Sequence, residues 1–299
     1  MSFQFRFTIV TPFFNSEKFI GRTLQSIKSQ NFKNFEWFVI NDASKDNTGN
    51  FINDFMNLSE IPIVYHNLKI NQGLLNNYNL AIKEARGEFI VFLGHDDEML
   101  PEALETFDCL IKKYDSPEIG AVYALAKDQN GSLIGKKYPN EEFISDYWTQ
   151  FFALGNEMEK FQCFRTDYLR EIYPIITEGD FRLPAAWLWG YLGLKYKAIF
   201  VNKVLRIYYT NTLTSLTKTT NRGDDPIRIY NYYLYWINEF QYQIKGNPLR
   251  RLRGIAGFAS YGLLARKNIS QQLAPVKGYK NKLLVLLLIP LAYLYNKCH

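Results

Sequence analysis

The residues best suited to chemistry are carboxylates that follow short apolar runs in the first hundred residues. Asp42 follows the run Phe35–Ile40, and the pair Asp96 and Asp97 follows Glu88–Leu93. Carboxylate oxygens are the ligands that Mg²⁺ and Mn²⁺ prefer, and such ions take further ligands from substrate phosphates. Asp42 could accept hydrogen bonds from a ribose or a base edge. The alternative for the Asp pair is a helix N-cap, but the neighbouring strand-end polar groups favour a ligand site.

A parallel sheet is the element expected to position these side chains. The apolar patterns predict four strands alternating with three helices: strand Phe7–Val10, helix Glu17–Ser29, strand Phe35–Ile40, helix Thr48–Met56, strand Ile61–His66, helix Leu74–Ala85 and strand Glu88–Leu93. This alternation predicts a doubly wound α/β fold, in which ligands bind beyond the carboxyl ends of the strands. No G-x-G-x-x-G or G-x-x-x-x-G-K-[ST] sequence follows the first strand, which disfavours a dinucleotide oxidoreductase and a P-loop NTPase.

Composition sets wider limits on the class of protein. The 299 residues are 47% hydrophobic and 21% charged, as in globular proteins, and 16% are aromatic. Three cysteines, without disulfide or zinc spacing, exclude a disulfide-rich secreted domain and a zinc module. The N-terminus lacks a signal-peptide pattern, so a cytoplasmic location is expected. The net charge of +6 comes without a recognisable nucleic-acid module, so no nucleic-acid partner is expected.

The strongest apolar run is Leu283–Tyr295, which Pro290 interrupts. A helix needs about 20 apolar residues to span a bilayer, and this run is shorter. Lysines flank it at positions 277, 280, 282 and 297. Two interpretations remain open: a helix packed on the domain, or a helix on an anionic membrane surface with its lysines on the headgroups.

Several motifs occur in a fixed order: Thr8–Asn15 (Thr-Ile-Val-Thr-Pro-Phe-Phe-Asn), Glu36–Asp46 (Glu-Trp-Phe-Val-Ile-Asn-Asp-Ala-Ser-Lys-Asp), Asn71-Gln72-Gly73, Ala85–Ile90 and Asp96-Asp97 with Pro101. Over about the first 105 residues this set closely resembles family-2 glycosyltransferases of the GT-A fold. A weaker similarity runs from about Cys163 to Tyr209. The resemblance implies a Rossmann-type, mostly parallel sheet flanked by helices. It also implies a nucleotide-sugar half over 1–105, an acceptor half over 106–215 and a helical C-terminal extension over 216–299.

The resemblance also implies a nucleotide-sugar donor, most simply a UDP-sugar, with Mn²⁺ or Mg²⁺. Carried over residue by residue, Thr11 and Asp42 would contact the base and ribose, and Asp96 would lie near the ribose and diphosphate. Asp97 would coordinate the cation, which would stabilise charge on the departing nucleoside diphosphate. The full expected donor set is Thr11, Pro12, Phe13, Asn15, Asp42, Asn71, Gly73 and Asp96.

Two positions depart from the family pattern. Gly94 stands where the family often has an Asp, and His95 beside it is expected to form local hydrogen bonds because hard ions prefer oxygen. An inverting transferase needs a carboxylate base near the acceptor hydroxyl. In similar sequences this acid comes just before a Trp-containing helix, and counting back from the segment Tyr196–Tyr209 that follows such a helix reaches about Pro184-Ala185, where there is no carboxylate. Asp180, then Glu178, are the nearest candidate bases, and the alternative is that the base is absent.

The function implied is an inverting, metal-dependent hexosyl- or N-acetylhexosaminyltransferase of bacterial envelope-polysaccharide synthesis. Its acceptor would be a glycan or a lipid-linked glycan at the inner face of the plasma membrane. Tyr147, Trp148, Trp187 and Trp189 could stack on acceptor sugars, with core packing as the alternative. A degenerate binding subunit remains a rival because of Gly94 and Ala185. A nucleotidyltransferase is a weaker rival, because Thr11–Lys18 supplies no Gly-rich basic phosphate loop.

Overall fold

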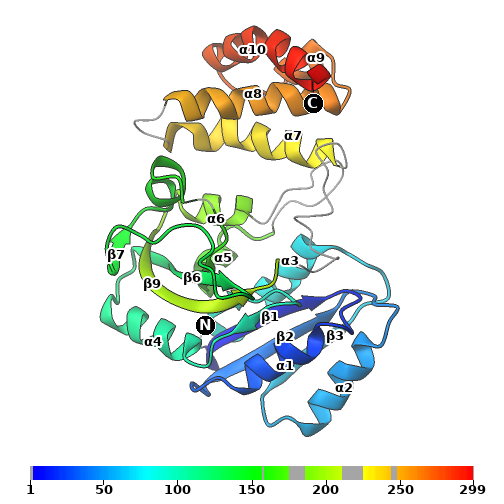
Figure 1. The fold of residues 1–299 in the computed structure, drawn as a ribbon, viewed down its shortest axis with the longest axis vertical. Coiled ribbons are helices and arrows are strands. Elements are labelled where there is room, and N and C mark those ends of the chain that lie inside the picture. The colour runs from blue at the N-terminus through cyan, green and yellow to red at the C-terminus, as the bar shows by residue number, and fades with distance from the viewer. Residues whose placement is uncertain (1–2, 157, 175–185, 211–224, 244–247, 299) are drawn as a thin grey trace. The chain divides into compact units, whose positions relative to one another are not determined.

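The computed structural model describes residues 3–156, 158–174, 186–210, 225–243 and 248–298 (Figure 1). The chain divides into two compact units. Among described residues, the first unit takes 3–146, 156, 158–174 and 195–210, and the second takes 147–155, 186–194, 225–243 and 248–298. The domain boundary expected at residue 215 lies outside the described residues.

The first unit is built on one mixed sheet, whose strands pair in the order β3-β2-β1-β4-β8-β6-β9-β5, with β7 pairing β9. The strands are β1 (Phe5–Phe13), β2 (Phe35–Asn41), β3 (Ile63–Asn67), β4 (Gly87–Phe92), β5 (Glu98–Met99), β6 (Ile119–Asp128), β7 (Glu142–Ser145), β8 (Phe161–Arg165) and β9 (Lys197–Tyr208). Strands β3, β2, β1 and β4 run parallel, whereas β8 is antiparallel to β4. The α/β class and the parallel arrangement of the first four long strands are therefore confirmed.

Helices of the first unit connect these strands and pack against the sheet (Figure 1). They are α1 (Ile20–Lys28), α2 (Thr48–Leu58), α3 (Leu74–Glu84), α4 (Ala103–Lys113) and α5 (Thr166–Arg170). Every residue of β2 is buried, as expected of a central parallel strand covered on both faces. The core between sheet and helices includes Phe7, Trp37, Phe107 and Phe161.

Helix α1 begins three residues later than the sequence predicts, at Ile20 instead of Glu17. The reason is that Ser16 and Glu17 bond to the loop after β2. The Ser16 amide donates to Thr48 Oγ1 at 2.7 Å, and the Glu17 carboxylate accepts from the Asn47 amide at 2.9 Å. The polar residues that could cap the helix thus tie two loops together.

The second unit is helical and aromatic-rich. Its helices are α6 (Ala186–Leu192), α7 (Pro226–Tyr235), α8 (Pro248–Leu264), α9 (Ile269–Leu273) and α10 (Tyr279–Cys298), with a π-helical turn at Thr149–Ala153 and another, Trp236–Phe240, continuing α7. The helical C-terminal part that the resemblance implies is confirmed. Tyr147 and Trp148 are buried within this unit, where Trp148 packs on Phe240 with ring centroids 4.7 Å apart, so core packing is the correct interpretation for this pair.

Helix α10 contains the whole Leu283–Tyr295 run, including Pro290. One face packs on α8 through Val285 and Ile289, and Asn296 bonds to Ser260 at 2.6 Å. Among the helices in the described part of the chain, none has the length and hydropathy that a bilayer span requires.

Candidate functional site

Three loops of the first unit meet at the carboxyl edge of the parallel strands. They follow β1, β2 and β4, and the strand register pairs Phe13 with Asn41 and Val10 with Phe92. Because neighbouring parallel strands end together, residues distant in sequence come into contact here. This edge is where the sequence placed the candidate donor site.

The first two loops are joined through Asn15, a predicted site residue. Its side-chain oxygen accepts from the Lys45 amide at 2.9 Å, and its own amide donates to Ser44 Oγ at 3.0 Å. Asn15 has φ 48° and Ala43 has φ 60°. Left-handed backbone at a non-glycine residue is costly, persists only when its surroundings enforce it, and clusters at functional sites.

Asp42 holds the loop that precedes α3. Its carboxylate is 3% exposed and accepts from the Gln72 amide at 2.7 Å, the Gly73 amide at 3.0 Å and Asn77 Nδ2 at 2.8 Å. Asn71 Nδ2 donates to the Asp42 carbonyl at 3.2 Å. The structure therefore brings together the predicted Asp42, Asn71 and Gly73, and it gives the Asp42 carboxylate a structural role in holding the loop before α3. The ribose contact of Asp42 stays a prediction.

Thr11 and Phe13 also depart from expectation, since both side chains lie in the core. The Thr11 hydroxyl accepts from Trp37 Nε1 at 3.0 Å, and Phe13 packs edge-on against the same indole. Because both side chains are buried, Thr11 and Phe13 could contact a ligand only through their backbone atoms. Pro12 is half-buried, and the next residue after Phe13, Phe14, is 43% exposed at the same edge.

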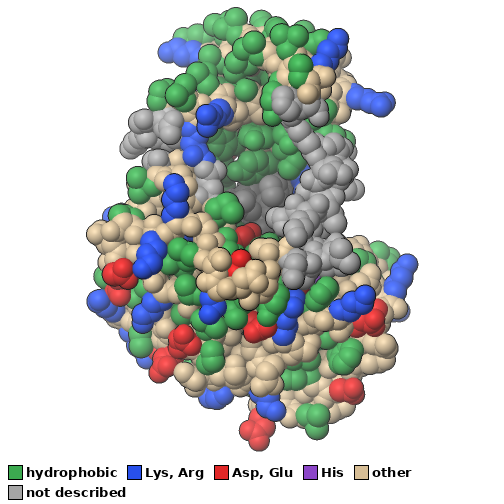
Figure 2. Space-filling model, viewed as in Figure 1, with side chains coloured by type: hydrophobic (Ala, Val, Ile, Leu, Met, Phe, Trp, Pro, Cys, Tyr) green, Lys and Arg blue, Asp and Glu red, His purple; other side chains and the backbone are tan. Residues whose placement is uncertain are grey.

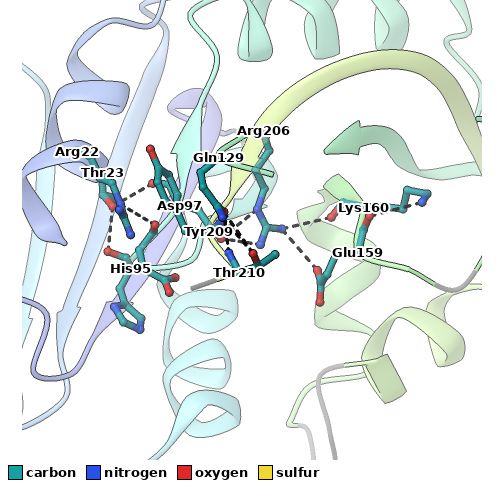
Figure 3. Close-up of polar contacts among 11 residues, drawn as sticks. Arg22, Thr23, His95, Asp97, Gln129, Glu159, Lys160, Arg206, Tyr209 and Thr210 are labelled. Atoms are coloured by element: carbon teal, nitrogen blue, oxygen red, sulfur yellow. Dashed lines mark hydrogen bonds and ion pairs between the residues drawn. The ribbon is translucent and has the colours of Figure 1, made fainter. Parts of the chain in front are cut away.

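The third loop, His95 to Asp97, is held by α1 (Figure 3). Arg22 Nε donates to the Asp96 carbonyl at 2.8 Å, and Thr23 Oγ1 lies 2.9 Å from the His95 carbonyl and 3.0 Å from the Asp97 carbonyl. The Arg22 guanidinium also stacks 3.5 Å over the Tyr209 ring. Sequence reasoning missed Arg22 and Thr23, because a helical sequence pattern does not show which loop the polar residues of that helix will contact.

His95 forms local hydrogen bonds, as predicted. Its Nδ1 lies 3.0 Å from Ser16 Oγ, and its carbonyl contacts Thr23. Burial lowers the pKa of His95; Asp96 opposes this shift and Arg22 adds to it. The imidazole is therefore held neutral near pH 7.

Asp97 is the residue whose surroundings differ most from the prediction. Its carboxylate is 1% exposed, and Oδ2 accepts from Arg206 Nη2 at 2.6 Å and Nε at 3.0 Å, while Oδ1 accepts from the Tyr209 amide at 3.1 Å (Figure 3). Burial raises the pKa of Asp97 to about 6, although Arg206 opposes this. The Asp97 carboxylate is thus paired with the Arg206 guanidinium on β9, an arrangement that does not support the predicted metal-ligand role of Asp97.

Gly94 explains how Asp97 reaches this position. A Cβ on Gly94 would lie 2.5 Å from Asp97 Oδ2 and 3.3 Å from Asp96 Oδ1. The carboxylate of Asp97 thus fills the space that a side chain at 94 would need. The absence of a side chain at Gly94 therefore makes room for the Asp97 carboxylate to pair with Arg206.

Asp96 is the remaining carboxylate of this loop, and it is half-buried at the edge. Within the described residues no group of three His, Cys, Asp or Glu side chains could hold a metal ion. A hard cation bound with a diphosphate needs only one or two carboxylates. The donor chemistry therefore fits a cation on Asp96 and the substrate phosphates, and it does not fit one on Asp97.

The candidate bases Asp180 and Glu178 lie outside the described residues, as does Ala185. Trp187 is within α6, but its side chain is not described, and Trp189 is half-buried.

Comparison with known proteins adds a family match. The family model described as "Glycosyl transferase family 2" matches residues 8–170. The chain is 26% identical over 242 residues to a GalNAc(5)-diNAcBac-PP-undecaprenol beta-1,3-glucosyltransferase of Campylobacter jejuni, a match covering 77% of this chain and 72% of that protein. It is 32% identical over 119 residues to the Staphylococcus aureus poly(ribitol-phosphate) beta-N-acetylglucosaminyltransferase TarS, covering 37% of this chain and 20% of TarS.

Solved structures share the fold. Residues 1–349 of S. aureus TarS in complex with UDP-GlcNAc superpose with a TM-score of 0.62 at 17% identity, covering 98% of this chain and 92% of that one. The mannosyltransferase PcManGT of Pyrobaculum calidifontis, in complex with GDP-Man and Mn²⁺, gives a TM-score of 0.56 at 16% identity, covering 98% and 87%.

Proposed function

Because the chain belongs to glycosyl transferase family 2, we propose that it transfers a sugar, with inversion, from a nucleoside-diphosphate donor at the carboxyl edge of its sheet. The observation that supports this most is the meeting of the three strand-end loops, with the half-buried Asp96 on the third. A nucleotidyltransferase, the rival enzyme class, is ruled out by the family match.

The donor would lie against the loops joined by Asn15 and Asp42. Asn71 and Phe14 are exposed side chains at this edge and are the groups we propose to contact the nucleotide. UDP-GlcNAc and GDP-Man, bound by the two structural neighbours, support a nucleotide sugar without choosing the base or the hexose. We take a UDP-sugar as the first candidate.

A divalent cation, Mn²⁺ or Mg²⁺, would be held by Asp96 and the donor phosphates. When bound it supplies charge stabilisation for the departing nucleoside diphosphate. Arg22 and Thr23 would keep the Asp96 backbone in place, and the Asp97–Arg206 pair would fix the following residue. Asp180, with Glu178 second, remains the proposed base for the acceptor hydroxyl; an unchanged transfer rate in Asp180→Asn would remove it.

The acceptor is proposed to be a glycan or a lipid-linked glycan of the bacterial envelope. The names of both curated relatives, one acting on an undecaprenol-linked glycan and one on poly(ribitol-phosphate), support this class. Since a lipid-linked acceptor resides in a bilayer, the enzyme would work as a peripheral protein at the inner membrane face.

A thermal-shift screen tests donor binding directly. UDP-, GDP- and TDP-sugars are added with and without Mn²⁺, and a ligand that binds only the folded state raises its stability. We expect one nucleotide series to raise the unfolding temperature more with Mn²⁺ than without it. No shift with any of the three nucleotides would contradict the proposal.

A second candidate is a subunit that binds a nucleotide sugar without turnover. The observation that favours it is the pairing of Asp97 with Arg206 above Gly94, which removes one carboxylate from the edge. Such a protein would respond in the thermal-shift screen but release no nucleotide from any donor.

A further inference from the structure

The second unit carries an apolar surface that its own packing leaves exposed. Helix α10 packs on α8, and its buried residues are Asn281, Val285, Ile289 and Ala292. The opposite face carries five leucines, each between 44% and 61% exposed: Leu283, Leu286, Leu287, Leu291 and Leu294. We call these five residues the leucine face.

A helix of a water-soluble unit normally turns charged or polar residues outward. Here the spacing of the leucine face, with steps of three, four and seven residues, places its members along one side of the helix. An exposed apolar stripe of this kind marks an interaction surface. Tyr279, Tyr293 and Tyr295, all at least half exposed, border it with amphipathic rings of the kind that favour a membrane–water interface.

The charge of the surrounding sequence indicates what covers the leucine face. From residue 226 to 299 the chain contains six lysines and five arginines but a single acid, Glu239, a balance of +10. Because the whole chain is +6, the preceding 225 residues carry −4. The basic excess of the protein therefore resides in the segment that contains α10.

Lysines also stand at the two ends of the leucine face. Lys280 and Lys282 precede it and Lys297 follows it, all exposed, and Figure 2 shows Lys and Arg side chains at the margins of the hydrophobic surface over α8–α10. Lys277 pairs instead with Glu239, at 2.5 Å. Leucines in the middle and cations at the ends match a helix lying flat at an anionic headgroup layer.

We propose that the leucine face of α10 binds the surface of an anionic lipid bilayer, with the helix parallel to the membrane and Lys280, Lys282 and Lys297 on the headgroups. A second copy of the chain would also cover the leucines, but it would bring the same basic excess against itself. The proposal extends the function above, since a lipid-linked acceptor is held in the same bilayer. Its test needs no sugar transfer.

Vesicle co-sedimentation of the full chain tests the proposal. One set of vesicles is phosphatidylcholine alone, and the other is equal parts phosphatidylcholine and phosphatidylglycerol. We expect binding to the anionic vesicles that weakens with added salt, and at least about tenfold weaker binding to neutral vesicles. Equal binding to both, or to neither, would overturn the proposal.

Matched variants locate the surface. Leu287→Gln/Leu291→Gln/Leu294→Gln should lower binding to anionic vesicles at least about tenfold, and Lys280→Gln/Lys282→Gln/Lys297→Gln should lower it and reduce its salt dependence. Leu58→Gln, at an 84% exposed leucine on α2, is the control and should bind as the wild type does.

Sedimentation velocity tests the alternative that a second copy of the chain, and not a bilayer, covers the leucine face. If the leucine face pairs with a second copy, the wild-type chain is a dimer that the triple leucine variant converts to a monomer, and vesicle binding is unaffected by that variant. That combination would contradict the proposal. Transfer to a water-soluble acceptor analogue should be equal in wild type and leucine variant, so failure of membrane binding and failure of the proposed reaction remain distinguishable.

Discussion

Asp97 and Arg206 form a buried ion pair whose two charges depend on each other. Both side chains are below a tenth exposed, and the guanidinium reaches the carboxylate through two nitrogens. A buried pair adds little stability relative to apolar residues, but removal of one partner leaves an uncompensated charge. The pair therefore acts as a positional constraint between β9 and the loop that carries Asp96.

Asp97→Asn should destabilise the fold by about 3 kcal/mol, because the buried Arg206 loses its nearest counter-ion and keeps only Glu159, 3.7 Å away. Denaturant unfolding measures this change. Asp96→Asn is the matched control, and at a half-buried position it should cost less than about 1 kcal/mol. Equal losses in the two variants would show that Asp97 is not the structural carboxylate.

Gly94→Asp, which restores the acid often present in the family, should not create a better metal site here. Its Cβ would press on Asp97 Oδ2, and the overpacking should cost about 1 to 3 kcal/mol. Gly21→Ala, where a Cβ meets nothing within 4 Å, is the control and should be neutral or slightly stabilising. A Gly94→Asp protein with wild-type stability and tighter Mn²⁺ binding would contradict this account.

The pH dependence of stability should include a contribution from His95. Burial lowers its pKa below the ordinary 6.5, so the unfolded chain binds a proton that the folded chain resists. The contribution is complete above 6.5 and is lost as pH falls through the lower folded pKa. We expect His95→Gln to show a smaller loss of unfolding free energy between about pH 7 and about pH 5. His66→Gln, at a histidine on β3, is the control. If unfolding free energy depends on pH in the same way in both variants, His95 is not the source of the pH dependence.

The loop between β3 and α3 depends on a contact from β2. Asp42, the second residue after Ile40, accepts two amide hydrogens of this loop and a third hydrogen from Asn77 on α3, so it ties the loop and the helix to the sheet edge, next to Gly73 with φ 80°. A carboxylate with three donors from one segment fixes that segment against the sheet edge. Donor affinity should therefore be sensitive to a residue that does not itself reach the solvent.

Asp42→Asn should loosen this loop without unfolding the sheet. An amide presents hydrogens to the Gln72 and Gly73 donors, so we expect hydrogen exchange at those amides to rise about tenfold or more and donor affinity to fall. Hydrogen-exchange mass spectrometry and the thermal-shift response report the two effects. Asp54→Asn, on the exposed side of α2, should change neither; a response equal to that of Asp42→Asn would contradict a local role.

The parallel half of the sheet was predictable because its strands are continuous apolar runs and its helices have one apolar face. The strand-end location of the site followed from the same pattern. The roles of individual side chains could not be predicted in this way. Asp42, Thr11 and Asp97 form hydrogen bonds with residues that lie 26 to 112 positions away in the sequence: Asn77, Trp37, Arg206 and Tyr209. The local sequence shows that a carboxylate follows a strand, but it does not show whether a cationic side chain from a distant part of the chain forms an ion pair with that carboxylate.

At the scale of the whole molecule, the basic excess and the candidate donor site lie in different segments of the chain. The segment before residue 226 is net acidic and contains the donor-site loops, whereas the segment after it holds the basic excess and the leucine face. This division suits an enzyme whose reaction unit works in water while another part binds a bilayer.

Release of nucleoside diphosphate from a donor sugar, measured with Mn²⁺ in wild type and Asp96→Asn, tests the central claim most directly. The account predicts release by the wild-type chain that falls by about 100-fold or more in Asp96→Asn, while its unfolding temperature stays close to that of the wild type. A wild-type chain that releases nucleotide from none of the UDP-, GDP- or TDP-sugars, or an Asp96→Asn chain that keeps the wild-type rate, would contradict it.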